Sequence, residues 1–129
     1  MMDPHQNQKP GGVIHLAPAL ARLENDRELL CDLARFYLED CPTLLAELRR
    51  GIGIEDFELI TRSAHSLKGL ASNFDAHRAV AAALAVELSG REKQMLAIQE
   101  QLPELEAAAM QVTSALQTEL LDPESGNGQ

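Results

Sequence analysis

The chain has 129 residues and a formal net charge of −9, from 11 basic and 20 acidic side chains; 45% of its residues are apolar and only 3% aromatic. This length is typical of one domain with one core, and the charge disfavours nucleic-acid and membrane-surface binding, both of which need basic side chains. With no Trp, three Phe and one Tyr, the core must rely on Leu and Ala, which favours helices over strands.

The two ends of the chain show no apolar periodicity. Residues 1–13 and 123–129 are rich in polar residues, Gly and Pro, so we expect flexible tails around one domain at residues 14–122. The longest apolar run, residues 79–86, is too short for a membrane span of about 20 residues. The N-terminus has no apolar signal-peptide core, so a cytoplasmic location is expected.

A short apolar segment, residues 14–23, opens the body of the chain. Asp26 is a good N-cap and should begin a long helix that ends near Arg50, where Gly51 and Gly53 would stop it. The core-facing side chains of this helix are expected to be Leu30, Leu33, Tyr37, Leu44 and Leu48.

The same predicted helix contains a proline and both cysteines. Pro42 has no backbone N–H, so it should kink the helix or split it. Cys31 and Cys41 are ten residues apart, which is about 15 Å along a helix axis. That distance is too long for a disulfide, so we expect two free thiols.

The next helix should begin near Glu55 and Asp56, because acidic residues suit a helix N-terminus. It should end near Asn73, and Asp75 is placed to cap the helix that follows. Its apolar positions recur at steps of three and four residues. They are Phe57, Ile60, Ala64, Leu67, Ala71 and Phe74.

Two more helices complete the predicted fold. Residues 76–88 are nearly all Ala, Val and Leu, which predicts burial on most sides, and Gly90 would close that helix. The last helix should begin near Glu92, with Pro103 interrupting it. Its apolar positions are Met95, Ile98, Leu102, Leu105, Ala109, Val112, Leu116 and Leu120.

This pattern predicts an all-α fold. Four long helices with short loops favour an antiparallel up-down four-helix bundle, and the short N-terminal segment should form a helix that caps one end. Metal and nucleotide motifs are missing: no histidine follows an acid by three residues, and no phosphate-binding glycine loop is present. We therefore expect no metal, no cofactor and no enzyme active site.

His65 is the strongest candidate for chemistry. It follows a core position, and one residue is a rotation of 100° on a helix, so its ring should point to the flank. Lys68, one turn on, could neutralise an anion held on the imidazole. Gly69 costs about 1 kcal/mol in a helix interior relative to Ala, and it would leave room for another protein's backbone. Arg62 and Ser72 make the rest of this face polar.

The local charge also favours an anion site. Residues 59–81 contain Arg62, Lys68 and Arg78 but only one acid, Asp75. The stretch from residue 94 to the end holds six acids and no base. Plainer interpretations remain open, because an exposed helical histidine beside a lysine is commonly inert and a mid-helix glycine often serves close helix packing.

Residues 64–69, AHSLKG, resemble the motif of histidine-containing phosphotransfer (HPt) domains. The stretch LARLENDRELLCDLARFYLEDCPTLLAELR looks like the first long helix of that family, and the layout from Ile14 to Leu121 is similar. The resemblance implies a phosphocarrier, not an enzyme, in which His65 carries a phosphoryl group between receiver-domain aspartates. It also implies receiver domains and a hybrid sensor histidine kinase as partners, with Mg²⁺ on the receiver.

Two more positions gain meaning from the resemblance. Glu87, 22 residues after His65, matches the polar residue of the following helix that often holds the other ring nitrogen in such domains; a solvated acid is the alternative. The family usually has Gly ten residues after the histidine, where this chain has Asp75. This departure should change the helix junction and its fit to a receiver.

We therefore expect a monomeric phosphocarrier. The alternative is a non-phosphorylating helical module that docks and sequesters receiver domains. A third hypothesis is a structural helical dimer whose apolar seam forms its interface.

Overall fold

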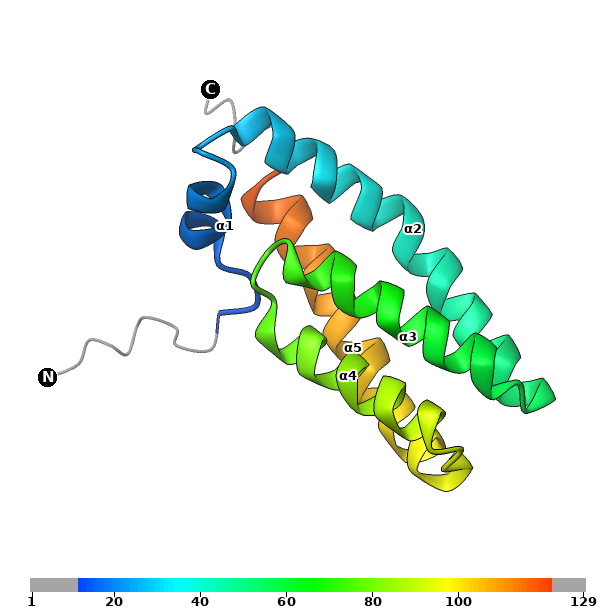
Figure 1. Ribbon diagram of the computed structural model, residues 1–129. Coiled ribbons are helices and arrows are strands. Elements are labelled where there is room, and N and C mark those ends of the chain that lie inside the picture. Colours follow the sequence, from blue (N-terminus) through cyan, green and yellow to red (C-terminus); the bar gives the residue numbers. More distant parts are fainter. Residues whose placement is uncertain (1–11, 122–129) are drawn as a thin grey trace, which may run out of the picture.

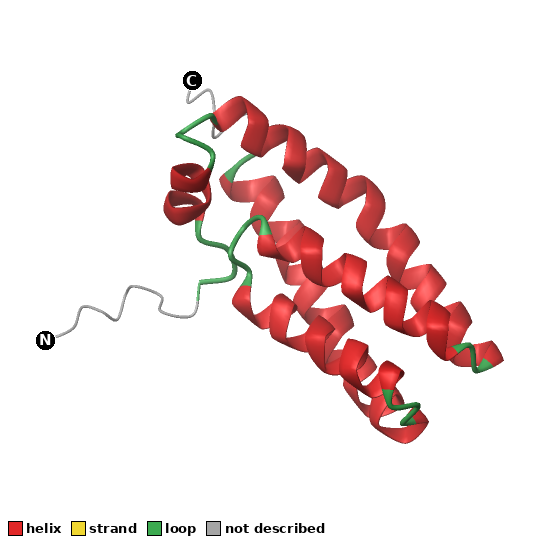
Figure 2. Cartoon of the chain, in the orientation of Figure 1, coloured by secondary structure: helices red, strands yellow, loops and turns green. Residues whose placement is uncertain are grey.

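The computed structural model describes residues 12–121. Residues 1–11 of the predicted N-terminal tail (residues 1–13) and all of the predicted C-terminal tail (residues 123–129) therefore lie outside the described residues. Within residues 12–121 the chain forms five helices joined by short turns and no strand (Figure 2). The helices are α1 (Leu16–Arg22), α2 (Arg27–Ile54), α3 (Phe57–Ser72), α4 (His77–Arg91) and α5 (Met95–Glu119).

Helices α2 to α5 form an antiparallel four-helix bundle, and α1 lies at one of its ends (Figure 1). The chain before α1 is tied to the turn between α3 and α4, because the backbone N–H of His15 donates to the carbonyl oxygen of Phe74 at 2.9 Å. The predicted all-α fold, a four-helix bundle with a short capping helix, is confirmed. In the described part of the chain, no helix is long and apolar enough to span a membrane.

The core lies between the four long helices and is built mainly from Leu, Ile, Val and Ala. Its largest polar member, Tyr37, donates its hydroxyl to the carbonyl oxygen of Ala109 at 3.0 Å, which links α2 to α5. On α3 the predicted apolar positions are buried except Phe57, which is only half-buried. Helix α4 differs from the prediction of burial on most sides, because Leu84 and Leu88 are exposed.

The predicted limits of α2 need correction. Asp26 caps its N-terminus as expected, accepting from the backbone N–H of Leu29 at 3.0 Å. The helix is not split at Pro42, however, and runs on to Ile54. One missing backbone hydrogen bond is a local loss, which the buried side chains on either side of Pro42 outweigh.

Gly51 and Gly53 lie inside α2 and do not stop it. The helix ends at Ile54, and the C-cap residue Glu55 takes a left-handed backbone conformation with φ 59°. Gly51 is needed for packing instead, because a Cβ atom at that position would lie 2.9 Å from Cγ1 of Ile60 on α3.

The predicted cap at Asp75 is also wrong. The N-cap of α4 is Ala76, which offers no side-chain hydrogen bond. The Asp75 carboxylate instead accepts from Arg22 Nη1 of α1 at 2.9 Å. Pro103 does not interrupt α5, which begins at Met95.

Both cysteines are free thiols, as predicted. Cys41 is buried and Cys31 is half-buried. Burial raises the pKa of the Cys41 thiol, which disfavours the reactive thiolate.

Candidate functional site

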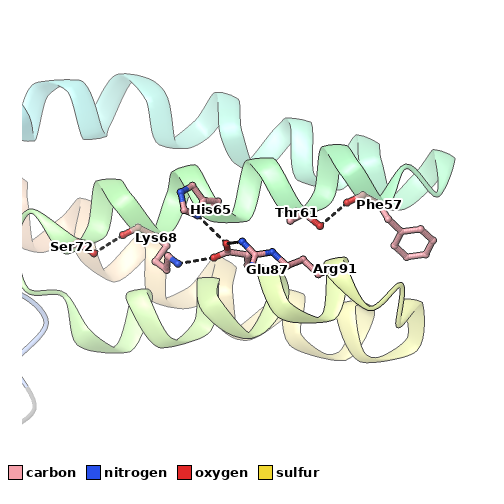
Figure 3. A network of polar contacts seen from close by, with 7 residues as sticks. All are labelled: Phe57, Thr61, His65, Lys68, Ser72, Glu87 and Arg91. Atoms are coloured by element: carbon pink, nitrogen blue, oxygen red, sulfur yellow. Dashed lines mark hydrogen bonds and ion pairs between the residues drawn. The ribbon is translucent and has the colours of Figure 1, made fainter.

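His65 lies in the middle of α3, and its side chain is 63% exposed. Its neighbour Ala64 is fully buried, so the predicted rotation of the His65 ring toward the flank is found. One edge of the ring faces α4 across the groove between the two helices (Figure 3). This places the ring where a side chain of α4 can reach one of its nitrogens.

Glu87 of α4 is that side chain. Its Oε2 atom lies 2.9 Å from Nδ1 of His65, although the residue is only 1% exposed. Because a carboxylate only accepts hydrogen bonds, Nδ1 donates to it, and Nε2 is left as the ring nitrogen with a lone pair. The solvated-acid alternative for Glu87 does not hold.

Two cations also contact the Glu87 carboxylate. Lys68 Nζ lies 2.8 Å from Oε1, and Arg91 Nη2 lies 2.7 Å from Oε2. Figure 3 shows the four side chains converging from α3 and α4. A buried carboxylate is costly unless it is paired in this way.

Lys68 also keeps Glu87 ionised. The Lys68 ammonium lowers the pKa of the Glu87 carboxyl below its usual value, and the His65 hydrogen bond adds to this effect. Burial acts in the opposite direction but is the weaker influence. A fixed negative charge therefore lies beside Nδ1 at neutral pH and favours any positive charge that develops on the ring.

The position of Lys68 modifies the expectation from the sequence. Its side chain is only 26% exposed, and its ammonium is paired with Glu87. An anion on His65 would therefore meet Lys68 as part of a charged cluster. Within that cluster, Lys68 and Arg91 carry two positive charges against one negative charge on Glu87.

Arg62 and Ser72 are exposed, and neither contacts the Glu87 carboxylate. Arg62 lines a shallow cleft of about 500 Å³ between α3 and α4, together with His65, Arg91 and Lys93. The Ser72 hydroxyl donates to the backbone oxygen of Lys68 at 2.8 Å, a contact within α3.

Arg78 does not belong to the site, although it was counted in the basic stretch around His65. Its guanidinium binds Glu104 of α5 at 2.6 Å and 2.8 Å. The basic side chains that pair with Glu87 or line the cleft at His65 are therefore Lys68, Arg91, Arg62 and Lys93.

Gly69 lies one turn beyond His65 and faces open space. A Cβ atom added there would have no heavy atom within 4 Å, so the glycine does not serve close helix packing. It lines a second hollow, between α2 and α3, together with Asp40, Thr43, Leu44, Ser66 and Leu70. The surface on the α2 side of His65 is therefore open and accessible.

Arg91 is the site residue that the sequence reasoning missed. Its spacing of four residues from Glu87 was the available signal, because residues i and i+4 are neighbours on a helix.

Of the four histidines, His5 lies outside the described residues. Between residues 12 and 121, no group of three or more His, Cys, Asp or Glu side chains could hold a metal ion.

Most of the chain matches a model of a known protein family. A family model described as the Hpt domain matches residues 32–120, which cover most of α2 and all of α3, α4 and α5. A search of curated proteins and a search of solved structures each found no match.

Proposed function

Because the chain belongs to the Hpt domain family, whose members carry phosphoryl groups on a histidine in phosphorelays, we propose that His65 is the phosphoryl acceptor. The observation that supports this most is the hydrogen bond between His65 Nδ1 and Glu87 Oε2. It orients an exposed imidazole and fixes which of its nitrogens is the nucleophile. Such proteins are phosphocarriers, and the partner supplies the rest of the chemistry.

The transfer step uses the lone pair on His65 Nε2. This nitrogen attacks the phosphorus of an aspartyl phosphate on the receiver domain, the bond from phosphorus to the aspartate oxygen breaks, and the aspartate leaves as a carboxylate. The positive charge that develops on the imidazole is stabilised by Glu87 through Nδ1–H. Mg²⁺ and the alignment of the phosphoryl group come from the receiver.

Lys68 and Arg91 stabilise the product in this proposal. Phosphorylation adds negative charge beside Glu87, which is itself negative, so nearby cations are needed to offset the repulsion. Both cations already lie within 2.8 Å of the Glu87 carboxylate. Small rotations of their flexible side chains would allow them to share hydrogen bonds between the carboxylate and the phosphoryl oxygens.

The surface around His65 would receive the receiver domain. Gly69 leaves the α2 side of the ring open, and Arg62 lies beside the cleft on the α4 side. We propose response-regulator receiver domains and a hybrid sensor histidine kinase as partners of a monomeric domain over residues 14–122. Ser72 shapes this surface through its bond to the α3 backbone.

The test is phosphoryl transfer from a receiver domain that carries a radiolabelled aspartyl phosphate. Wild-type protein should take up the label in an acid-labile form, whereas His65→Gln should take up none. His77→Gln is the matched control, because His77 is an exposed helical histidine outside the site, and it should behave as wild type. Uptake that survives in His65→Gln would contradict the proposal. Binding of the receiver without any uptake would favour the non-phosphorylating module.

A further inference from the structure

Helices α3 and α4 approach each other closely at Gly90. A Cβ atom at this position would lie 2.5 Å from Oγ1 of Thr61, 3.3 Å from Cγ2 of Ile60 and 3.4 Å from Cα of Thr61. The first of these distances is well below any van der Waals contact. Any side chain at position 90 therefore requires either Thr61 or a whole helix to move.

Thr61 is poorly able to move away. Its hydroxyl donates to the backbone oxygen of Phe57 at 2.8 Å, a bond that is lost if the side chain rotates. Because Thr is branched at Cβ, one of the two possible rotations only exchanges the hydroxyl for the methyl group. The clash caused by a larger residue at position 90 would thus be relieved mainly by separating α4 from α3.

The contact between Gly90 and Thr61 lies one helical turn from the contact between Glu87 and His65. Thr61 precedes His65 by four residues on α3, and Gly90 follows Glu87 by three residues on α4. Because the two helices are antiparallel, both contacts belong to the same interface, as the positions of Thr61, His65 and Glu87 in Figure 3 show. The spacing at Gly90 is therefore transmitted directly to the site.

We propose that Gly90 is a positioning residue, which acts through Glu87 by holding α4 close enough for the carboxylate to reach His65 Nδ1. The distance of 2.9 Å between these atoms leaves little margin, since a hydrogen bond is lost beyond about 3.5 Å. The importance of Gly90 for phosphoryl transfer depends on the function proposed above for His65. The effect of Gly90 on the geometry of the His65 ring does not depend on that function.

Gly90→Ala tests this proposal, with Gly53→Ala as the control. Both glycines lie inside helices, but a Cβ atom at position 53 would meet nothing within 4 Å. Nitrogen NMR of the histidine rings reports which ring nitrogen of His65 carries the proton. We expect wild type and Gly53→Ala to hold the proton on Nδ1, whereas Gly90→Ala should populate both tautomers. Phosphoryl uptake by Gly90→Ala should fall about tenfold, the size of effect expected when a charge-assisted hydrogen bond is lost.

Two second-site changes complete the test. Adding Thr61→Ala to Gly90→Ala removes the clashing hydroxyl and should restore both the tautomer and the uptake rate. Thr61→Ile in the otherwise unchanged chain fills the same space from α3, and it decides the question should Gly90→Ala fail to fold. A folded Gly90→Ala or Thr61→Ile protein with the wild-type tautomer and rate would overturn the proposal. If the tautomer shifts in Gly90→Ala but the wild-type protein accepts no phosphoryl group, the function proposed for His65 is rejected and the positioning role of Gly90 is kept.

Discussion

The Oε2 atom of Glu87 lies 2.9 Å from Nδ1 of His65, so a buried carboxylate on α4 holds an exposed histidine on α3. The two residues are 22 positions apart in the sequence, and only the antiparallel packing of the helices brings them together. The contact defines the state of the ring before any partner arrives. An exposed histidine without it would sample several rotamers and both tautomers.

Glu87→Gln should slow phosphoryl uptake at His65 by about 10- to 100-fold, because a hydrogen bond to a charged group is worth about 1.5–3 kcal/mol. Glutamine keeps the shape of the side chain but not its charge. The measurement is a single-turnover transfer rate from a phosphorylated receiver domain. Glu104→Gln is the control, since Glu104 is paired with Arg78 away from the site, and its rate should stay at the wild-type value. Equal rates for both variants would show that Glu87 does not assist transfer.

The charge on Glu87 should also make stability depend on pH. Lys68 holds the pKa of the Glu87 carboxyl below its usual value in the folded protein. The stability from ionised Glu87 is therefore complete above the ordinary glutamate pKa of about 4.3, and it is lost as the pH falls through the lower pKa of the folded state.

Urea unfolding of wild type and Glu87→Gln from pH 7 to pH 3 measures this dependence. The difference in free energy of unfolding between the two proteins should shrink as the pH falls below the ordinary glutamate pKa and through the lower pKa of folded Glu87. Titrations of groups that do not contact Glu87 largely cancel in the difference. A difference in free energy of unfolding that is unchanged down to pH 3 would mean that ionisation of Glu87 does not stabilise the folded state.

Arg91→Met should separate stability from function. The Arg91 side chain is 59% exposed, so removing its charge should change the free energy of unfolding by less than about 1 kcal/mol. Phosphoryl transfer should slow about tenfold, because a charge-assisted hydrogen bond to the product is lost.

Arg49→Met is a closely matched control for Arg91→Met. Arg49 is 52% exposed and is paired with Glu106 at 2.7 Å, on the side of the bundle formed by α2 and α5. Its loss should have a similar small effect on stability and none on transfer. Equal transfer rates for the two variants would show that Arg91 does not assist phosphoryl transfer.

The open surface at Gly69 gives opposite expectations for two substitutions. Gly69→Ala should raise the free energy of unfolding by up to about 1 kcal/mol, because the added methyl group meets no neighbour. Gly69→Leu should keep the fold but weaken binding of the receiver domain, measured by titration calorimetry, because its side chain fills the space beside His65. Unchanged receiver affinity in Gly69→Leu would show that the partner does not approach over this surface.

The sequence predicted those features that repeat along a single helix. Spacings of three and four residues identified the apolar faces, and the position of His65 after buried Ala64 predicted that its ring would face the flank. The Asp26 cap was predictable for the same reason, since its bond to the backbone of Leu29 spans only three residues. Such patterns depend on local geometry alone.

Contacts between helices were harder to predict, because they depend on the rotation and register of two elements. Gly51 was expected to end α2, but its role is set by Ile60 on the next helix. Asp75 was expected to cap α4, but its carboxylate is taken by Arg22, 53 positions away.

The charged residues of the site show the same limit. Arg78 was placed near His65 by its position in the sequence, yet it faces α5 and binds Glu104. Arg91 lay outside the stretch counted as basic, yet its guanidinium touches the carboxylate that holds His65. Net charge over a segment therefore predicted a basic site but assigned the wrong arginine to it.

The most direct measurement is the identity of the phosphorylated atom. Protein labelled with ¹⁵N on its histidine rings is phosphorylated by a receiver domain, and coupling between ³¹P and ¹⁵N is then recorded by NMR. Because Glu87 occupies Nδ1, the coupling should appear at Nε2 of His65 and at no other nitrogen. A phosphoryl group on Nδ1 of His65, or on a different residue, would contradict the central role of the contact between Glu87 and His65.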